Sequence, residues 1–320
     1  MFTVYVCQSM PDEILAPLRE LADVGVWPEP GPVERETLLR EAARCEGLLS
    51  MLNVPIDRAL LESSPRLKVV SQMAVGVDNI DVPACSDRGI LIGHTPDVLT
   101  ETVADTAFAL LAAVVRRIPE GERHVREGKW GPWNPWSMLG RDLHEATLGI
   151  IGMGRIGQAL ARRATGFDMR LIYDSPRDMS VAGATRVSLE ALLADADFVV
   201  VAAPLKSGTE HLIGERELDA MKPTSYLVNV SRGRLVDTAA LVTALESHSI
   251  AGAALDVTDP EPLPPDHELL RFDNCLVVPH IGSASLRARK AMASLAVDNL
   301  IAGLLDQPMP ARYKGGNGLG

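Results

Sequence analysis

Residues 146–165 have the sequence ATLGIIGMGRIGQALARRAT. The apolar run at its start predicts a buried strand, and the alternation of apolar and charged residues at its end predicts a surface helix. Between the two lies the hexapeptide GMGRIG at residues 152–157, with glycine at its first, third and sixth positions. A strand, a glycine turn and a helix in direct succession place backbone N–H groups at a helix N-terminus, where they can bind an anion.

Each glycine of this turn has a separate physical purpose. Gly152 permits the tight turn, Gly154 lets the backbone approach a pyrophosphate, and Gly157 allows the helix to pack closely on the strand. The next predicted strand ends in Asp174, 22 residues after Gly152, where a carboxylate would accept hydrogen bonds from an adenosine ribose. A glycine-rich turn without a ligand is the plain alternative, and the flanking strand and helix favour a dinucleotide site over it.

Apolar runs alternate with amphipathic stretches along the rest of the chain, which is typical of βαβ units and parallel sheets. Short buried strands are expected at residues 2–8, 46–52, 67–73, 89–95, 146–152, 169–174, 196–204, 224–231, 251–257 and 274–281. Helices are expected between them, for example at residues 11–22, 34–43, 157–165 and 189–194. The sequence therefore predicts an α/β protein with doubly wound parallel sheets.

Two long helices, at about residues 99–117 and 285–305, do not fit inside a single βαβ series. We expect them to join two domains, because 320 residues suffice for two separate hydrophobic cores. The first domain would comprise residues 1–98 and 291–320, and the second would comprise residues 99–290. The glycine-rich end of the chain is expected to be frayed.

The composition excludes several classes of protein. Hydrophobic residues make up 47% of the chain and charged residues 23%, which are values of globular proteins and not of disordered or collagen-like chains. The net charge of −11 argues against binding to nucleic acid or to anionic membranes. The longest apolar helical run, residues 107–115, is far shorter than the roughly 20 residues that cross a bilayer.

The N-terminal sequence has neither a basic region nor a cleavage site, so we expect no signal peptide. The cysteines lie far apart and lack the spacing of metal ligands, which indicates buried thiols in a reducing compartment and no metal site. They are Cys7, Cys45, Cys85 and Cys275. These features predict a soluble cytoplasmic protein.

Arg232, Glu261 and His280 each lie at or just beyond the end of a predicted strand. Because ligands of doubly wound sheets bind beyond the carboxyl ends of the strands, the three side chains would meet there. Arginine can bind a carboxylate bidentately, histidine can donate a proton to a carbonyl oxygen, and glutamate can orient the imidazole, so the set suits reduction of a 2-keto acid. Taken singly, Arg232 could cap a helix, Glu261 could be a solvated charge, and His280 could be an ordinary core histidine.

These motifs together resemble those of the D-isomer-specific 2-hydroxyacid dehydrogenases over nearly the whole chain. The resemblance rests on AVGVDNID, TPDVLTETVAD, LGIIGMGRIGQALARR, VNVSRGRLVD, GAALDVTDPEPLP and VVPHIGSAS. Glu261 lies 29 residues after Arg232, and His280 lies 19 residues after Glu261, which fits the family's arginine, glutamate and histidine. The segments LDVTDPEPLP, DNCLVVPHIGSAS and WGPWNPWSMLG are most similar to the glyoxylate/hydroxypyruvate reductases. TDPEP stands where many relatives have FEPEP, which leaves Glu261 in register.

The resemblance implies that the larger domain is a Rossmann dinucleotide-binding domain, inserted in a smaller flavodoxin-like substrate domain. It implies catalysis by Arg232, Glu261 and His280. It also implies that Arg232 and the backbone N–H groups of Val75 and Gly76 bind the substrate carboxylate. Judged from its residues alone, the segment AVGVDN would be an ordinary loop.

The resemblance further implies that Asp256 binds the nicotinamide carboxamide, although a turn-forming aspartate is an equal interpretation from the residues alone. The full set of implied cofactor contacts comprises Gly152, Gly154, Arg155, Ile156, Gly157, Asp174, Pro204, Thr209, Val230, Ser231, Asp256, His280 and Gly282. Asp174 favours NAD(H), because the 2′-phosphate of NADP(H) would face a carboxylate. Arg155 and Arg177 could pair with that phosphate, which leaves NADP(H) open.

Trp130, Trp133 and Trp136 are interleaved with prolines, which excludes a regular helix or strand. One interpretation is a loop pinned to the core by aromatic anchors, and the other is an arm that packs on a second copy, since interface cores are rich in aromatic residues. In the reductases that the chain resembles, this region lies at the dimer interface and its tip can close the partner's substrate pocket. The resemblance therefore favours the arm and a homodimer.

The expected activity is NADH-dependent reduction of small anionic 2-keto acids, glyoxylate to glycolate and hydroxypyruvate to D-glycerate, with His280 as the acid/base. One alternative on the same scaffold is a dehydrogenase of another D-2-hydroxyacid or of phosphite. Another is a non-catalytic NAD-sensing protein similar to the corepressors built on this fold.

Overall fold

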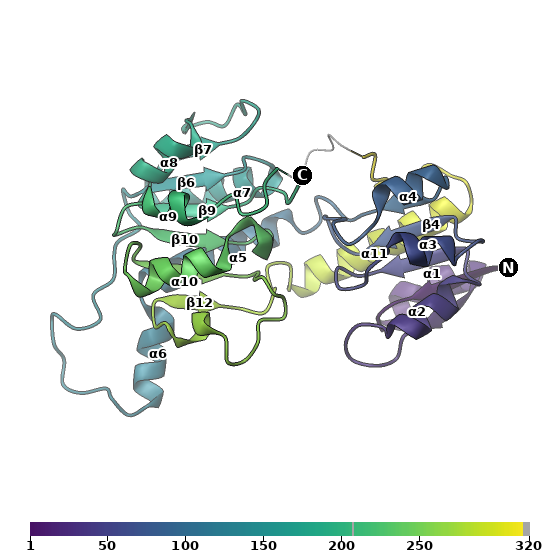
Figure 1. The fold of residues 1–320 in the computed structure, drawn as a ribbon, viewed down its shortest axis with the longest axis horizontal. Helices are drawn as coiled ribbons and strands as arrows, with labels where there is room; N and C mark the ends of the chain where they lie inside the picture. Colours follow the sequence, from purple (N-terminus) through teal and green to yellow (C-terminus); the bar gives the residue numbers. More distant parts are fainter. Residues whose placement is uncertain (207, 316–320) are drawn as a thin grey trace. The chain divides into compact units, whose positions relative to one another are not determined.

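The computed structural model describes residues 1–206 and 208–315. The chain forms two units, one from residues 1–99 together with the segment that begins at Ala284, the other from Thr100–Ser283. Each unit is a parallel α/β sheet flanked by helices (Figure 1), so the predicted fold class of two doubly wound parallel-sheet domains is confirmed. The frayed end expected at residues 313–320 falls largely outside the described residues.

The first unit contains a five-stranded sheet in the order β2-β1-β3-β4-β5, which is the flavodoxin-like order. Its strands are β1 (Phe2–Val6), β2 (Ala22–Val26), β3 (Gly47–Ser50), β4 (Val69–Gln72) and β5 (Leu91–Gly93). Its helices are α1 (Asp12–Leu21), α2 (Arg35–Ala42), α3 (Arg58–Glu62), α4 (Val82–Asp87) and α11 (Leu286–Leu304). The sequence did not predict β2, because this edge strand is only partly buried and carries no continuous apolar run.

Helix α11 belongs entirely to the first unit. It packs against β3, β4 and β5, and the Ser71 hydroxyl on β4 donates a hydrogen bond of 2.7 Å to the Ala296 carbonyl. The Ser285 side chain caps the start of the helix by accepting from the Ala288 N–H. The unit boundary therefore lies at Ser283 and not at residue 290, because a boundary at residue 290 would cut through one continuous helix.

The second unit contains a seven-stranded parallel sheet in the order β12-β11-β10-β9-β6-β7-β8. Its strands are β6 (Thr147–Ile151), β7 (Arg170–Asp174), β8 (Ala184–Arg186), β9 (Phe198–Val201), β10 (Tyr226–Asn229), β11 (Gly252–Leu255) and β12 (Cys275–Val277). Its α-helices are α5 (Thr100–Val115), α6 (Ile118–Arg126), α7 (Arg155–Ala164), α8 (Leu189–Asp195), α9 (Glu215–Asp219) and α10 (Thr238–Glu246). Three short 3₁₀ helices complete it, η1 (Thr165–Phe167), η2 (Gly233–Leu235) and η3 (Glu268–Arg271).

The strand order of this sheet reverses at β6, and the helices accordingly cover both faces (Figure 1). Helices α5 and α7 pack against each other, and α8, α9 and α10 form a second row. Leu192, Leu218 and Leu241 from this second row pack with the sheet in one buried apolar cluster. The short strand β8 was not predicted, because two of its three residues are exposed.

All strands of the larger sheet run in the same direction, so their carboxyl ends share one edge. The segments that follow β6, β10, β11 and β12 therefore leave the sheet at this edge. These segments are residues 152–157, 230–232, 256–262 and 278–283. Every predicted catalytic residue lies in one of them, although they are far apart in the sequence. Among the described residues, no helix has the length and apolarity needed to cross a bilayer.

Candidate active site

The glycine turn after β6 is shaped by close backbone approaches. Gly152 has φ +97°, and a Cβ there would lie 2.6 Å from the Ala203 amide nitrogen. A Cβ on Gly157 would lie 2.3 Å from the Gly152 carbonyl oxygen, so only glycine lets α7 start this close to β6. Gly154 is the N-cap of α7 and has no side chain to cap the first turn. The turn and the start of α7 thus fit an anionic pyrophosphate.

Asp174 is the last residue of β7 and lies beside this turn, since its carbonyl oxygen accepts a hydrogen bond of 2.9 Å from the Gly152 N–H. Burial raises the pKa of the Asp174 carboxyl above its ordinary value, and the positive charge of Arg186 opposes this shift. Arg177 is exposed, and Arg155 is half-buried in the first turn of α7. The carboxylate, the glycine turn and the helix start together fit the adenosine end of a dinucleotide.

The remaining residues implied as cofactor contacts follow β9 and β10. Thr209 donates to the Pro204 carbonyl over 2.9 Å, and the Ser231 hydroxyl donates to the Ala203 carbonyl over 2.5 Å. The second bond ties the segment after β10 to the segment after β9. Val230 is buried next to Ser231.

Glu261 and His280 are in direct contact. The imidazole Nδ1 lies 2.6 Å from the Glu261 Oε1, and because an ionised carboxylate only accepts, Nδ1 carries the hydrogen. Burial alone would raise the pKa of Glu261. The hydrogen bond and charge of His280, helped by the Thr258 N–H and Arg232, hold that pKa below its ordinary value. The arrangement leaves Nε2 of His280 as the nitrogen available for proton transfer.

Asp256 holds the turn that carries His280. Its Oδ1 accepts from the Ile281 N–H at 2.7 Å, and its Oδ2 accepts from the Gly282 N–H at 2.8 Å. The His280 N–H donates to the Asp256 carbonyl at 2.9 Å, and His280 has φ +53°, a left-handed conformation that is rare outside glycine. Burial raises the pKa of Asp256, and the two N–H donors oppose the shift. The sequence left Asp256 either as a cofactor contact implied by the resemblance or as a turn-forming aspartate, and it did not predict that this carboxylate holds the turn of His280.

Asn229 was also missed by the sequence analysis. It is fully buried at the end of β10, and its side chain donates to the Arg232 carbonyl at 2.8 Å while accepting from the Ser231 N–H at 3.1 Å. Gly233 follows Arg232, and a Cβ on Gly233 would lie 1.9 Å from the Thr258 carbonyl oxygen. The Arg232 segment therefore packs directly on the segment that leads to Glu261. An amide at the end of a buried apolar strand is the signal that could have revealed this role.

Val75 and Gly76 lie in the loop that follows β4, at the carboxyl edge of the sheet of the first unit. No group of three His, Cys, Asp or Glu side chains that could hold a metal ion occurs among residues 1–206 and 208–315. In the second unit, Arg232, Glu261 and His280 lie in segments that leave the sheet at one edge.

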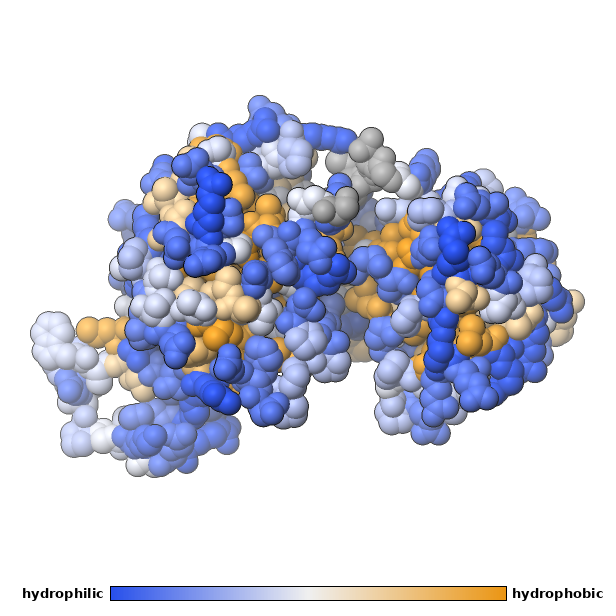
Figure 2. Space-filling view, viewed as in Figure 1, coloured by the Kyte–Doolittle hydropathy of each residue, from blue (hydrophilic) through white to orange (hydrophobic). Residues whose placement is uncertain are grey.

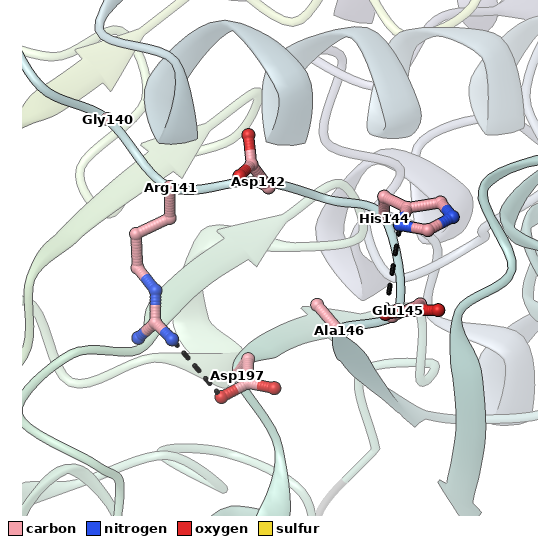
Figure 3. A pocket seen from close by; sticks show the side chains of 7 residues that line it. All are labelled: Gly140, Arg141, Asp142, His144, Glu145, Ala146 and Asp197. Carbon is pink, nitrogen blue, oxygen red and sulfur yellow. Dashed lines mark ion pairs between the residues drawn. The ribbon is translucent and has the colours of Figure 1, made fainter.

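A polar cavity of about 410 Å³ opens at the opposite edge of the larger sheet (Figure 3). Ala146 and Asp197 in its wall directly precede β6 and β9, so it lies at the amino ends of the strands. Asp197 accepts from the Thr147 N–H at 2.9 Å and lies 3.8 Å from Arg141. The wall carries the carboxylates of Asp142, Glu145 and Asp197 together with Arg141 and His144. The cavity lies away from the edge where doubly wound sheets bind ligands.

Residues 130–139, which we call the tryptophan segment, follow α6. This segment leaves the body of the second unit as an open loop (Figure 1). The side chains of Trp130, Trp133 and Trp136 are 77%, 86% and 80% exposed. Figure 2 shows this segment projecting from the unit with side chains of mixed hydropathy. The interpretation as a loop pinned to the core by aromatic anchors is therefore wrong, because none of the three rings reaches the core of this chain.

The family model described as "D-isomer specific 2-hydroxyacid dehydrogenase, NAD binding domain" matches residues 108–282. A glyoxylate reductase of Korarchaeum cryptofilum is 47% identical over 304 residues, covering 93% of this chain and 92% of the relative. A crystal structure of a Thermus thermophilus protein has a TM-score of 0.92 at 43% identity and covers 98% of this chain and 100% of its own.

Another similar structure is that of an NADPH-dependent glyoxylate/hydroxypyruvate reductase from Sinorhizobium meliloti, in complex with NADP and malonate. It has a TM-score of 0.84 at 34% identity and covers 97% of this chain and 96% of its own.

Replacing His280 with leucine should raise the pKa of the Glu261 carboxyl. Burial would still disfavour the carboxylate, while the hydrogen bond and the charge that stabilise it would be lost. In a pH titration followed by the carboxyl ¹³C resonance of Glu261, the midpoint should move to higher pH. The exposed His248, replaced in the same way, serves as the control and should leave the midpoint unchanged. Equal midpoints in wild type and His280→Leu would contradict the pairing.

Proposed function

The chain belongs to the D-isomer specific 2-hydroxyacid dehydrogenase family, and we propose that it reduces glyoxylate and hydroxypyruvate with NADH as the preferred reductant. The observation that carries the proposal is the 2.6 Å contact between His280 and Glu261, at the sheet edge that also bears Arg232 and the glycine turn. The relatives named glyoxylate reductase support the choice of substrate.

The glycine turn and Asp174 would hold NADH, which would supply the hydride for the keto carbon. His280 donates the proton of its Nε2 to the carbonyl oxygen, so that one hydride and one proton convert the keto group into a hydroxyl group. Glu261 accepts from Nδ1 throughout, which keeps the imidazole oriented and leaves Nε2 for the proton transfer.

The carboxylate of the substrate requires positive charge, and the protein as a whole is acidic. Arg232 provides this charge locally and binds the carboxylate through its guanidinium N–H groups. In the first unit, the backbone N–H groups of Val75 and Gly76 are the further carboxylate donors that the resemblance to the family implies. Asp256 orients the nicotinamide carboxamide and, through Ile281 and Gly282, the turn of His280.

The preference for NADH follows from the position of Asp174. Its carboxylate can accept hydrogen bonds from both ribose hydroxyls of NADH, whereas the 2′-phosphate of NADPH would place a charge of about −1.5 to −2 beside it. Arg177, exposed three residues further on, and Arg155, half-buried in the first turn of α7, are the two arginines that can offset that repulsion.

The tryptophan segment is proposed to be an arm that packs on a second copy of the chain in a homodimer. Three tryptophans and Leu139, which is 58% exposed, project from one short loop, and large apolar side chains exposed close together mark protein–protein contact sites. Aromatic side chains of this size are also the residues most enriched in interface cores.

Replacing His280 with alanine should lower kcat for glyoxylate by roughly 10²–10⁴-fold, because general acid catalysis contributes about this much. The affinity for NADH, measured by quenching of protein fluorescence, should stay close to that of wild type. His248→Ala, at an exposed position on the same unit, should keep full activity. A His280→Ala enzyme with more than a tenth of the wild-type kcat would refute the role of His280.

A steady-state panel of glyoxylate, hydroxypyruvate and pyruvate with both cofactors tests the substrate and the cofactor together. We expect turnover of the first two acids and at least about a tenfold preference for NADH in kcat/KM, since about 1.4 kcal/mol gives that factor. Asp174→Ser should erode the preference by admitting NADPH. Asp219→Ser removes an exposed carboxylate of the same unit and should leave the ratio unchanged. Equal use of both cofactors by the wild-type enzyme would show that Arg155 and Arg177 offset the repulsion between Asp174 and the 2′-phosphate.

The wild-type protein should be a dimer by light scattering at micromolar concentration. Trp136→Ala should shift it towards monomer or alter its substrate specificity, because an apolar anchor would be lost from the interface. Leu286→Ala removes a side chain of similar exposure from the other unit and should leave the dimer intact. A monomeric wild-type protein would refute the proposal that the tryptophan segment packs on a second copy of the chain.

A further inference from the structure

The loop that contains Val75 and Gly76 is held by the end of the neighbouring strand. His94 follows β5 directly, and its Nδ1 lies 3.0 Å from the Val75 carbonyl oxygen. Because a carbonyl oxygen only accepts, Nδ1 carries the hydrogen and donates it. The next residue of the same segment, Thr95, donates its N–H to the Ala74 carbonyl at 2.8 Å. Two successive carbonyl groups of the loop are therefore bound by two successive residues after β5.

The bond to Val75 determines the direction of a second group. The Val75 carbonyl and the Gly76 N–H belong to the same planar peptide unit, in which the two groups point in opposite directions. Fixing the oxygen on His94 therefore aims the Gly76 N–H away from His94. Without this bond the peptide could rotate easily, because glycine accepts φ values of either sign. Hydrogen bonding at the oxygen also polarises the peptide and strengthens its N–H as a donor.

His94 is itself held on several sides. The side chain of Asn299, fully buried in α11, donates to the His94 carbonyl at 2.9 Å and accepts from the Ala311 N–H at 2.8 Å. The His94 N–H donates to the Ala311 carbonyl at 3.1 Å. The ring of Tyr313 meets the imidazole edge-on, with the ring centroids 5.5 Å apart. His94 is thus half-buried, with its backbone bound by Asn299 and Ala311 and its ring against Tyr313.

These segments approach β5 because Gly93 leaves room for them. A Cβ on Gly93 would lie 2.7 Å from the Cβ of Asn299. Gly93 forms an antiparallel bridge with Arg312, and the Tyr313 N–H donates to the Ile92 carbonyl at 2.8 Å. The C-terminal segment therefore extends the hydrogen bonding of β5 at the point where His94 leaves the sheet.

We propose that His94 is a positioning residue for substrate binding, which aims the Gly76 N–H at the substrate carboxylate and is held in place by Asn299 and the segment 311–313. The proposal rests on the proposed function, because it assigns His94 a role at the carboxylate donors Val75 and Gly76. His94 acts only through the peptide that it orients and takes no part in proton transfer. Its loss should therefore weaken the binding of the acid and leave the binding of NADH unchanged.

The test compares His94→Leu with His94→Asn by steady-state kinetics with glyoxylate. Leucine and asparagine have nearly the same shape, but only asparagine offers an N–H donor near the position of Nδ1. His94→Leu should raise KM for glyoxylate roughly tenfold to hundredfold, as expected for loss of one hydrogen bond to a charged group, with a smaller change in kcat. His94→Asn should recover a large part of this loss. KM for NADH should not change in either variant.

Inhibition by oxamate in the presence of NADH provides a second measurement. Oxamate carries the carboxylate but has no reducible keto group, so its inhibition constant reports carboxylate binding without turnover. The constant should rise in His94→Leu by about the same factor as KM. Unchanged constants in a folded His94→Leu enzyme, or equal losses in the leucine and asparagine variants, would overturn the proposal.

Tyr313→Ala keeps the proposal testable if His94→Leu does not fold. It leaves the imidazole donor in place and removes the ring that packs against it, so it should raise KM for glyoxylate by a smaller factor. No rise in that variant would overturn the proposal. A wild-type enzyme that reduces no 2-keto acid would refute the proposed function itself, which distinguishes the two failures.

Discussion

The carboxylate of Asp256 is the group on which the geometry of the site depends. His280 sits in the left-handed region at φ +53°, which costs a non-glycine residue roughly 1–3 kcal/mol. The two N–H donors of Ile281 and Gly282 bind the buried Asp256 carboxylate, and hydrogen bonds to charged groups contribute about 1.5–3 kcal/mol each. Two such bonds offset the strain, so the turn keeps the one conformation in which the imidazole reaches Glu261.

The other site segments lie close together because they leave the parallel sheet at one common edge. Residues after β6, β10, β11 and β12 leave the sheet at this edge, and each segment is then fixed by contacts to its neighbour. Asn229 holds the Arg232 segment, Ser231 ties it to the segment after β9, and Gly233 lets it pack against Thr258. The lowered pKa of Glu261 reflects the resulting proximity of His280 and Arg232. At the opposite edge, Arg141 lies 3.8 Å from Asp197 in the wall of a polar cavity.

In the first unit, too, contacts between neighbouring segments fix a loop at the carboxyl edge of the sheet. The carboxylate donors that we propose in its loop after β4 are the backbone N–H groups of Val75 and Gly76, so the direction of each peptide matters more than the residue type. His94, Asn299 and Tyr313 lie on three separate segments, and together they fix one peptide of that loop. The chain returns to this unit at Ala284 and thereby places residues 311–313 beside His94, whose imidazole binds the Val75 carbonyl.

The sequence by itself determined the fold class, the glycine turn and the identity of the charged residues, because each depends on side-chain type or on spacing within one segment. It did not reveal β2 or β8, since both are half-exposed edge strands without an apolar run, and it placed the second domain boundary inside α11. Only the tertiary structure decided that Asp256 anchors the turn of His280, that Asn229 holds the Arg232 segment, and that His94 binds the Val75 carbonyl. The reason is physical. These contacts end on backbone N–H and carbonyl groups, which all residues share, so the sequence carries no mark of which groups the packing of distant strands will bring together.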